Sequence, residues 1–218
     1  MVTEPGKADR RRETGERTRE RLLCAARGLL AEHGEDAVTL RDITGAADAN
    51  IAAVSYHFGS KDALCRAAAE NAIDAIVDAQ VAAFEDLPDD ASLEEVAALW
   101  IRPLVGSFAP QEEGDAHQLQ LRLVARAASG SAELRDYFRA AIERAEPTLM
   151  EVLHGVLPDV PADELRLRLH CVRGMVNFLS ASNSLGADLA GKDAGEIERL
   201  LVPMVTGVLA GGAPVLRD

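Results

Sequence analysis

The stretch from residue 39 to residue 61 constrains the fold of this chain more than any other part of the sequence. It reads TLRDITGAADANIAAVSYHFGSK. Thr39, followed by Asp42 three positions later, is close to a capping box and predicts a short helix over about Leu40–Ala47. After a tight turn, a second short helix is expected over about Ile51–His57. Two short helices joined by a tight turn have the layout of a helix-turn-helix motif.

The rest of the sequence is also typical of helices. Aromatic residues make up 4% of the chain, whereas Ala, Leu, Arg and Glu, which lose little on entering a helix, recur throughout. Apolar positions repeat at intervals of three and four, and Gly34, Ser60, Ser92 and Asp193 supply helix stops or caps. We therefore expect an all-α protein with helices over about 16–33, 40–47, 51–57, 61–84, 92–108, 115–128, 132–157, 162–185 and 194–209.

The order of these helices predicts two domains, with a short segment before the first and another after the second. The expected parts are a flexible arm over 1–15, a helix-turn-helix domain over 16–62, a larger helical domain over 63–212 and a tail over 213–218. Pro103, Pro147 and Pro203 fall inside predicted helices, which they should kink or split. No apolar run is long enough to span a membrane, and no apolar signal region follows the N-terminal arginines, so we expect a cytoplasmic protein.

The charge is unevenly distributed along the chain. The formal net charge is −13, but residues 1–70 hold 11 Lys and Arg against 12 Asp and Glu, whereas residues 71–218 hold 12 against 24. The first part can therefore present a local basic face, which is what phosphates sense within a Debye length. The acidic remainder favours solubility and discourages non-specific docking.

The second short helix of the motif has the composition of a nucleic-acid reader. Ile51 and Val54 can anchor it inward. Small or hydrogen-bonding groups are left for the outer positions Asn50, Ala52, Ala53, Ser55, Tyr56 and His57. Small side chains let a helix enter the major groove, where base edges carry a distinct code. The alternative is a helical hairpin with no role in nucleic-acid binding.

This stretch resembles the DNA-binding domain of TetR-family repressors, especially members that read N-I-A-A-V-x-Y-H-F-G-S-K. The resemblance is close over residues 17–65. It implies phosphate contacts from Thr39, Tyr56 and Lys61, and positions near bases or the DNA backbone for Asn50, Ala53, Ser55 and His57. Arg41 can add a contact from the flank, since a cation there supports phosphate binding.

The chain departs from the family pattern in the turn of the motif. Asp48 and Ala49 stand where the family usually has Gly-Val. Asp tolerates the left-handed backbone conformation better than most residues, so the turn is expected to form with some strain. Its carboxylate would lie near DNA, where it is expected to weaken or retune binding.

The last two predicted helices are too apolar to be solvated along one side. Because one reader helix covers few base pairs, proteins of this layout bind DNA as twofold dimers. In the TetR family the last two helices usually pair with their twins as a four-helix bundle. The predicted dimer interface contains Leu165, Leu169, Val172, Val176, Leu179, Ile197, Leu201, Met204 and Val208. The alternative is that these residues pack only within one chain.

A pocket between helices of the larger domain is the expected site for a small-molecule effector. Family position and chemistry suggest Trp100, Leu104, Phe108, His117, Leu121, Met150, His154, Met175 and Phe178. Methionine and aromatic side chains suit an adaptable apolar ligand. His117, His154 or Asn177 can orient a polar end of that ligand.

These features predict a ligand-responsive transcription repressor that acts as a homodimer on a double-stranded, inverted-repeat operator. The two reader helices would lie roughly 34–36 Å apart, about one DNA turn. Effector binding would shift the sensor helices and swing the long fourth helix, so that this spacing no longer fits. No cofactor and no metal site are expected, because the five His residues are scattered.

Two other classes of protein remain as alternatives. An enzyme is disfavoured because the sequence has no nucleophile elbow, zinc-binding helix or paired cysteines, and residues 186–192 approach a P-loop only until Asp193 replaces Ser or Thr. Cys24, Cys65 and Cys171 are interpreted as small buried hydrophobes. A helical interaction or small-molecule-binding module that keeps the fold without reading DNA is the alternative function, which Asp48 and the acidic balance favour slightly.

Overall fold

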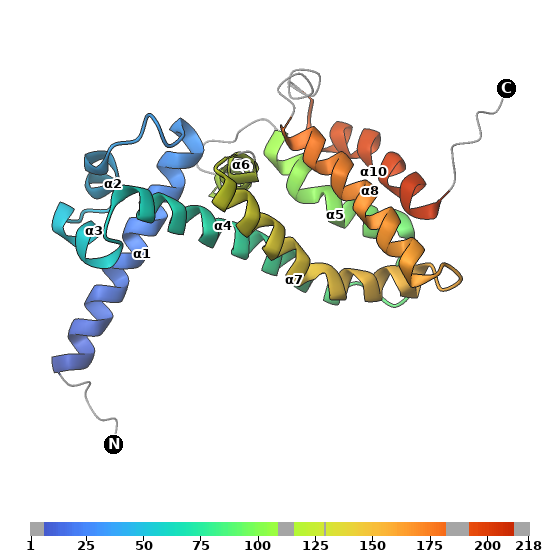
Figure 1. Cartoon of the computed structure of the whole chain (residues 1–218), viewed down its shortest axis with the longest axis horizontal. Coiled ribbons are helices and arrows are strands. Elements are labelled where there is room, and N and C mark those ends of the chain that lie inside the picture. The colour runs from blue at the N-terminus through green and yellow to red at the C-terminus, as the bar shows by residue number, and fades with distance from the viewer. Residues whose placement is uncertain (1–6, 109–115, 129, 182–191, 212–218) are drawn as a thin grey trace. The chain divides into compact units, whose positions relative to one another are not determined.

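The computed structural model describes residues 7–108, 116–128, 130–181 and 192–211. Every regular element in these ranges is an α-helix, as the sequence predicts (Figure 1). The chain divides into two compact units, Met1–Ala72 and Ile73–Asp218. The division falls inside the fourth helix rather than at the expected 62/63 boundary, because the first turns of that helix belong to the core of the first unit.

The first unit is built from three helices and the start of a fourth. Helix α1 (Lys7–His33) contacts both α2 (Leu40–Ala46) and α3 (Ile51–His57), and α4 (Lys61–Glu85) follows. The side chains buried between them are Leu22, Leu23, Ala26, Leu30, Ile43, Val54, Leu64 and Ala68. Full burial of each large apolar side chain is worth roughly 1.5–3 kcal/mol, so this small core is enough to fix two very short helices.

The N-terminal helix is longer than predicted. α1 begins at Lys7, so the prediction of a flexible arm was wrong for residues 7–15, and residues 1–6 lie outside the described ranges. Lys, Ala, Arg and Glu directly after Pro5-Gly6 are strong helix formers, and Gly15 costs only about 1 kcal/mol relative to Ala within a helix. The helix ends, as predicted, at Gly34, which has a φ of 79°.

The second unit contains the rest of α4 and five further helices among the described residues: α5 (Leu93–Phe108), α6 (Ala116–Ala128), α7 (Ala132–Val156), α8 (Ala162–Ala181) and α10 (Ala194–Ala210). α10 packs against α5 and α8, and α7 packs against α6 and α8 (Figure 1). Their shared core includes Val96, Ile101, Leu104, Leu149, Leu153, Leu169, Val172, Ile197, Leu201, Val205 and Leu209.

The predicted caps set several helix ends. Ser92 and Glu95 exchange hydrogen bonds at the start of α5, and Asp193 forms a full capping box with Glu196 at the start of α10. The described part of α8 ends at Ala181, and the glycine-rich stretch 182–191 lies outside the described residues. No helix among the described residues has the length and apolar character needed to cross a membrane.

The three internal prolines do not split their helices. Pro103, Pro147 and Pro203 lie inside α5, α7 and α10, each of which continues through its proline. Proline removes one backbone hydrogen-bond donor, but the neighbouring tertiary contacts hold the helix. In α5, the Nε2 of Gln80 from α4 donates to the carbonyl of Trp100 at 2.9 Å.

The cysteines lie in two different environments. Cys65 is buried, as predicted, and this burial raises the pKa of its thiol to about 11. Cys24 and Cys171 are exposed, which contradicts the prediction. In α1 the inner face is taken by Leu22, Leu23 and Ala26, so Cys24 points away from the core.

Candidate functional site

The outer face of α3 is the most exposed part of the predicted reader. Asn50 caps the helix, its Oδ1 accepting the backbone N–H of Ala52 at 2.9 Å. Val54 is buried and anchors the helix, as expected. Tyr56 is 85% exposed. Ile51 is 44% exposed, so the prediction that it anchors the helix inward was wrong. It is the first residue of α3, whereas the buried residue of this helix is Val54, about one turn farther on.

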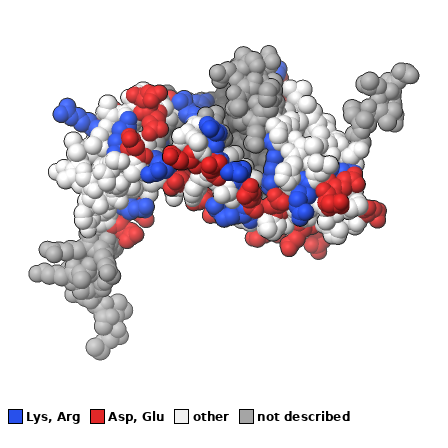
Figure 2. Space-filling model, viewed as in Figure 1, with Lys and Arg blue, Asp and Glu red and all other residues white. Residues whose placement is uncertain are grey.

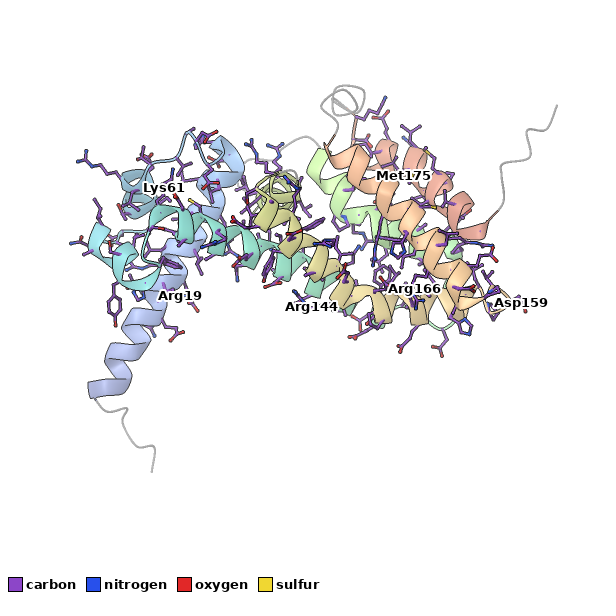
Figure 3. The ribbon with its side chains drawn as sticks, viewed as in Figure 1. Arg19, Lys61, Arg144, Asp159, Arg166 and Met175 are labelled. Atoms are coloured by element: carbon purple, nitrogen blue, oxygen red, sulfur yellow. The ribbon has the colours of Figure 1, made fainter. Side chains whose placement is uncertain are left out.

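The remaining predicted base or backbone contacts surround this exposed tyrosine. Ser55 is exposed, whereas Ala53 and His57 are half-buried. The rings of Tyr56 and His57 meet edge to face with centroids 4.9 Å apart. The guanidinium of Arg19, on α1, lies 5.3 Å from the ring centroid of Phe58 (Figure 3). Sequence reasoning missed Arg19, since a cation that meets a ring on another helix leaves no periodic signal.

Two of the residues expected to hold phosphates already make bonds within the chain. The hydroxyl of Thr39 donates to Oδ2 of Asp42 at 2.6 Å, the backbone N–H of Thr39 donates to the same oxygen at 2.8 Å, and the N–H of Asp42 donates back to the hydroxyl at 3.3 Å. The Thr39 hydrogen bonds hold the pKa of Asp42 below its ordinary value. Nζ of Lys61 donates to the carbonyl of Glu35 at 3.0 Å (Figure 3), which leaves its other two N–H groups for an anion.

The turn between α2 and α3 has the conformation expected of it. Asp48 has a φ of 45°, in the left-handed region. Its Oδ2 lies 3.7 Å from Nη1 of Arg21 on α1, and both side chains are exposed. The carboxylate is therefore partly compensated by a cation of the same unit. Arg41, on α2, is exposed.

The residues predicted to line an effector pocket have different environments. Trp100, Met150 and Met175 are partly buried against the core of the second unit, and Leu104 and Leu121 are buried. His154 is exposed, one position past the buried core residue Leu153, and its role in a pocket stays a prediction. The side chains of Phe108, His117 and Phe178 lie outside the described residues. Among those described, no group of three His, Cys, Asp or Glu residues is placed to hold a metal ion.

The residues predicted for a dimer interface lie mostly inside the chain. Leu165, Leu169, Val172, Ile197 and Leu201 are buried in the core of the second unit, so their prediction as interface residues was wrong. Their heptad-like spacing reflects packing between α5, α7, α8 and α10. Met204 is 53% exposed and Val208 half-buried, and the side chains of Val176 and Leu179 lie outside the described residues.

Three large apolar side chains of the same two helices are exposed. Leu167 on α8 is 65% exposed, and Leu200 on α10 is 50% exposed. We call Leu167, Leu200 and Met204 the outer apolar face. In Figure 2 charged side chains gather at the lower end of α8, whereas few are seen over the upper parts of α8 and α10. Sequence reasoning missed Leu167; the available signal was that it stands out of phase with the core stripe of α8.

Two polar clusters connect α7 with its neighbours. Oδ2 of Asp74, on α4, accepts the hydroxyl of Tyr137 at 2.6 Å, and its Oδ1 accepts Nη2 of Arg144 at 2.5 Å. Farther along α7, Oε2 of Glu146 accepts Nη1 of Arg173 at 2.7 Å, and its Oε1 accepts Nε of Arg166 at 3.3 Å (Figure 3). The bond from Arg173, more than that from Arg166, holds the pKa of Glu146 below its ordinary value.

Comparison with known proteins assigns both units to one family. Residues 22–68 match the family described as bacterial regulatory proteins, tetR family, and residues 99–211 match the tetracyclin repressor-like C-terminal domain. The second match alone covers more than half of the chain.

The chain belongs to the TetR family.

Individual relatives are similar to this chain over different lengths. This TetR-family chain is 43% identical, over 56 residues, to the HTH-type transcriptional dual regulator CecR of Shigella flexneri; the match covers 26% of this chain and 25% of that protein. A protein from Saccharomonospora viridis solved in complex with choline is 22% identical with a TM-score of 0.60, over 86% of this chain and 94% of that one. The TetR family transcriptional regulator PfmR of Thermus thermophilus is 21% identical with a TM-score of 0.56, over 92% and 98%. The two structures show the fold.

Proposed function

We propose that this protein is a DNA-binding transcriptional regulator that occupies an inverted-repeat operator as a homodimer and leaves it when a small molecule binds the second unit. The observation that carries the proposal is the outer face of α3, where Tyr56 is 85% exposed beside exposed Asn50 and Ser55. A tyrosine that is held rigidly on a short capped helix and directed to solvent presents an O–H donor suited to a phosphate or base edge.

The surroundings of α3 support contact with the DNA backbone. Arg41, Lys61 and Tyr56 come from three successive helices of the unit and offer cationic or hydroxyl donors. Thr39 can add its backbone and hydroxyl only by exchanging its bond to Asp42, so we expect its contribution to be smaller. The intramolecular bond of Lys61 to Glu35 orients the side chain without using all its donors.

The outer apolar face supports the homodimer. Leu167, Leu200 and Met204 expose large apolar side chains on two helices that pack side by side. A second copy, related by a twofold axis, would cover them with the same surface and form a bundle of four helices. The dimer would place two α3 helices on two half-sites.

The experiment that tests the DNA-binding proposal is fluorescence anisotropy with DNA from the region flanking the protein's own gene, at two salt concentrations. The variants are Tyr56→Phe, which removes only the hydroxyl, and Arg41→Gln. We expect each variant to weaken DNA binding about tenfold, which corresponds to the loss of one charge-assisted or hydroxyl hydrogen bond. Arg41→Gln should also reduce the slope of log affinity against log salt concentration by the equivalent of about one phosphate contact.

The matched control is Arg139→Gln, which removes the same charge from an exposed position in the other unit. It should leave DNA affinity unchanged. If genome-wide fragments also bind no better than random DNA, the DNA-binding proposal is wrong, and a helical interaction module that keeps the fold takes its place.

A further inference from the structure

The Glu146 cluster, between α7 and α8, carries an excess of one positive charge. Two arginines of α8, Arg166 and Arg173, converge on its single carboxylate. The two arginines differ in burial: the side chain of Arg166 is 56% exposed, and that of Arg173 is 14% exposed. Arg173 therefore holds its guanidinium in a mostly desolvated position.

One donor of this buried guanidinium has no acceptor. Nη1 of Arg173 is used by Glu146, but Nε is fully buried and makes no hydrogen bond in the described structure. A buried, unpaired N–H is costly, more so on a charged group, and such groups are rare in native proteins unless a water, an ion or a ligand serves them. The edge of an arginine that carries Nε is one on which a carboxylate can dock with two parallel N–H···O bonds.

The surroundings of this edge fit a ligand with an apolar body. Leu169 and Val172 precede Arg173 on α8 by four residues and one residue, and Leu149 lies three residues after Glu146 on α7; all three are buried core residues. Met150, one helical turn beyond Glu146, is partly buried against the same core. A charged anchor among flexible or branched apolar side chains is the combination that small-molecule sites use to fix the orientation of a ligand.

We propose that the effector of this protein carries a carboxylate, and that Arg173 binds it through its Nε edge in competition with Glu146. This inference rests on the ligand response proposed above. In the free protein Glu146 accepts from the Nη1 side of the guanidinium. Its negative charge opposes a carboxylate on the Nε side, so that an acidic ligand weakens the bond between Glu146 and Arg173. The contact between α7 and α8 would then depend on ligand, which gives the ligand different contacts in two states of the unit.

The test measures thermal stabilisation and calorimetric binding of the full-length protein with sodium acetate, hexanoate and benzoate. Each acid is compared with its amide (acetamide, hexanamide, benzamide) at constant ionic strength, since a ligand that binds only the folded state raises the melting temperature. At least one acid should stabilise the wild-type protein more than its amide does.

Three variants separate ligand binding from a structural role. Arg173→Gln should weaken binding of that acid about tenfold or more, because the charged anchor is lost. Glu146→Gln should tighten it about tenfold, because the competing carboxylate is removed. Arg166→Gln, which removes an exposed partner of the same Glu146, should change it little. A purely structural cluster predicts that Arg173→Gln and Glu146→Gln only destabilise the protein and confer no preference for acids.

Circular dichroism checks that each variant is folded. If Arg173→Gln does not fold, Arg173→Lys replaces it, because lysine keeps the charge but lacks the edge with two parallel N–H donors. This variant should bind the acid more weakly than wild type. The proposal is overturned if no acid is preferred over its amide in either wild type or Glu146→Gln, or if the folded Arg173 variants retain the preference. DNA anisotropy on the same protein distinguishes this failure from failure of the proposed function.

Discussion

Asp48 occupies a turn position where both its backbone and its charge matter. Its φ of 45° places it in the left-handed region, where a side chain other than that of Gly is strained. Its carboxylate lies two residues before the cap of α3 and 3.7 Å from Arg21. The residue therefore affects folding through its backbone and DNA binding through its charge, and these two effects are separable by substitution.

Two substitutions of Asp48 should separate strain from charge. Asp48→Gly removes both, so we expect a gain of about 1 kcal/mol in the free energy of unfolding, measured by urea denaturation. Asp48→Asn keeps a residue that tolerates the left-handed region and removes only the charge, so its stability should stay close to wild type. Both variants should bind DNA more tightly by a similar factor, since Arg21 is freed in both. Unequal affinities would show that turn geometry, not charge, sets DNA binding.

Local conformation at single residues was predictable, whereas the direction of a side chain was less so. Three expected features depend on residue type and a few neighbours: the left-handed turn at Asp48, the stop at Gly34 and the capping role of Thr39. The exposure of Ile51 and Cys24 depends on which face of a helix meets its neighbours. The packing of helices against one another decides this, so residue type alone gave the wrong exposure for both residues.

At the level of elements, the carboxylates that cap α2 and α5 make stability depend on pH. Hydrogen bonds from Thr39 hold the pKa of Asp42 below its ordinary value, and those from Ser92 do the same for Glu95. The unfolded chain therefore takes up these protons first as the pH falls. Their contribution is present above the unfolded values of about 3.9 and 4.3 and is lost as the pH falls through the lower native values.

Removing the titrating groups should therefore flatten the acid side of the stability curve. We expect Asp42→Asn to be less stable than wild type near neutral pH, with the difference shrinking as the pH falls below about 4. Glu95→Gln should behave alike, and the double variant should show the sum, because the two caps lie in different units. The measurement is the urea midpoint across this pH range. A difference that stays constant with pH would contradict the role given to the charged carboxylates.

Arg168 caps the end of α10 from the neighbouring helix. Its Nη1 donates to the carbonyl of Leu209 at 2.6 Å, and its Nη2 bonds to Glu164. Gly211, which ends α10 with a φ of 71°, leaves the space for this guanidinium: a Cβ there would collide with it. The left-handed conformation and the close approach both require glycine.

Substitutions at this cap should be less than additive. We expect Arg168→Met and Gly211→Ala each to cost about 1–3 kcal/mol in the free energy of unfolding, the first through a lost hydrogen bond and the second through backbone strain and displacement of Arg168. In the double variant, alanine at 211 no longer has a guanidinium to displace, so the combined cost should fall short of the sum. Strict additivity in chemical denaturation would show that the two residues do not interact.

Most helix bounds could be predicted because they depend on caps and on glycine or proline. The start of α1 could not be placed as well, since a run of charged helix formers after Pro5-Gly6 reads equally as a solvated arm. The prolines of α5, α7 and α10 were expected to kink or split their helices, and each helix continues through its proline. Polar clusters such as Asp74 with Tyr137 join residues far apart in sequence and follow from no local rule.

For the whole molecule, the hardest question for sequence reasoning was which apolar face of α8 and α10 is inside. Both helices carry apolar side chains outside their core stripes, and periodicity identifies stripes without showing what covers them. The stripe with the best heptad spacing, including Leu165, Leu169 and Ile197, is the core of one chain. The outer apolar face, Leu167, Leu200 and Met204, is what remains for a second copy.

A charge on the outer apolar face should therefore separate the proposed dimer without unfolding either unit. Because these side chains are already 50–65% exposed in one chain, Leu200→Glu and Met204→Glu should leave the monomer's stability nearly unchanged. We expect the double variant to be monomeric by sedimentation at concentrations where wild type is a dimer, since a buried, unpaired carboxylate on each side opposes association. Its affinity for a two-site operator should fall, while its affinity for a single half-site should not.

The control is Leu201→Ala, next to Leu200 but in the core. It should lower the free energy of unfolding by about 2–5 kcal/mol. Its effect on the monomer–dimer equilibrium should be smaller than that of the charged variants, because the side chain does not reach the outer face. If the charged double variant stays dimeric and binds the operator as wild type does, the two copies meet elsewhere.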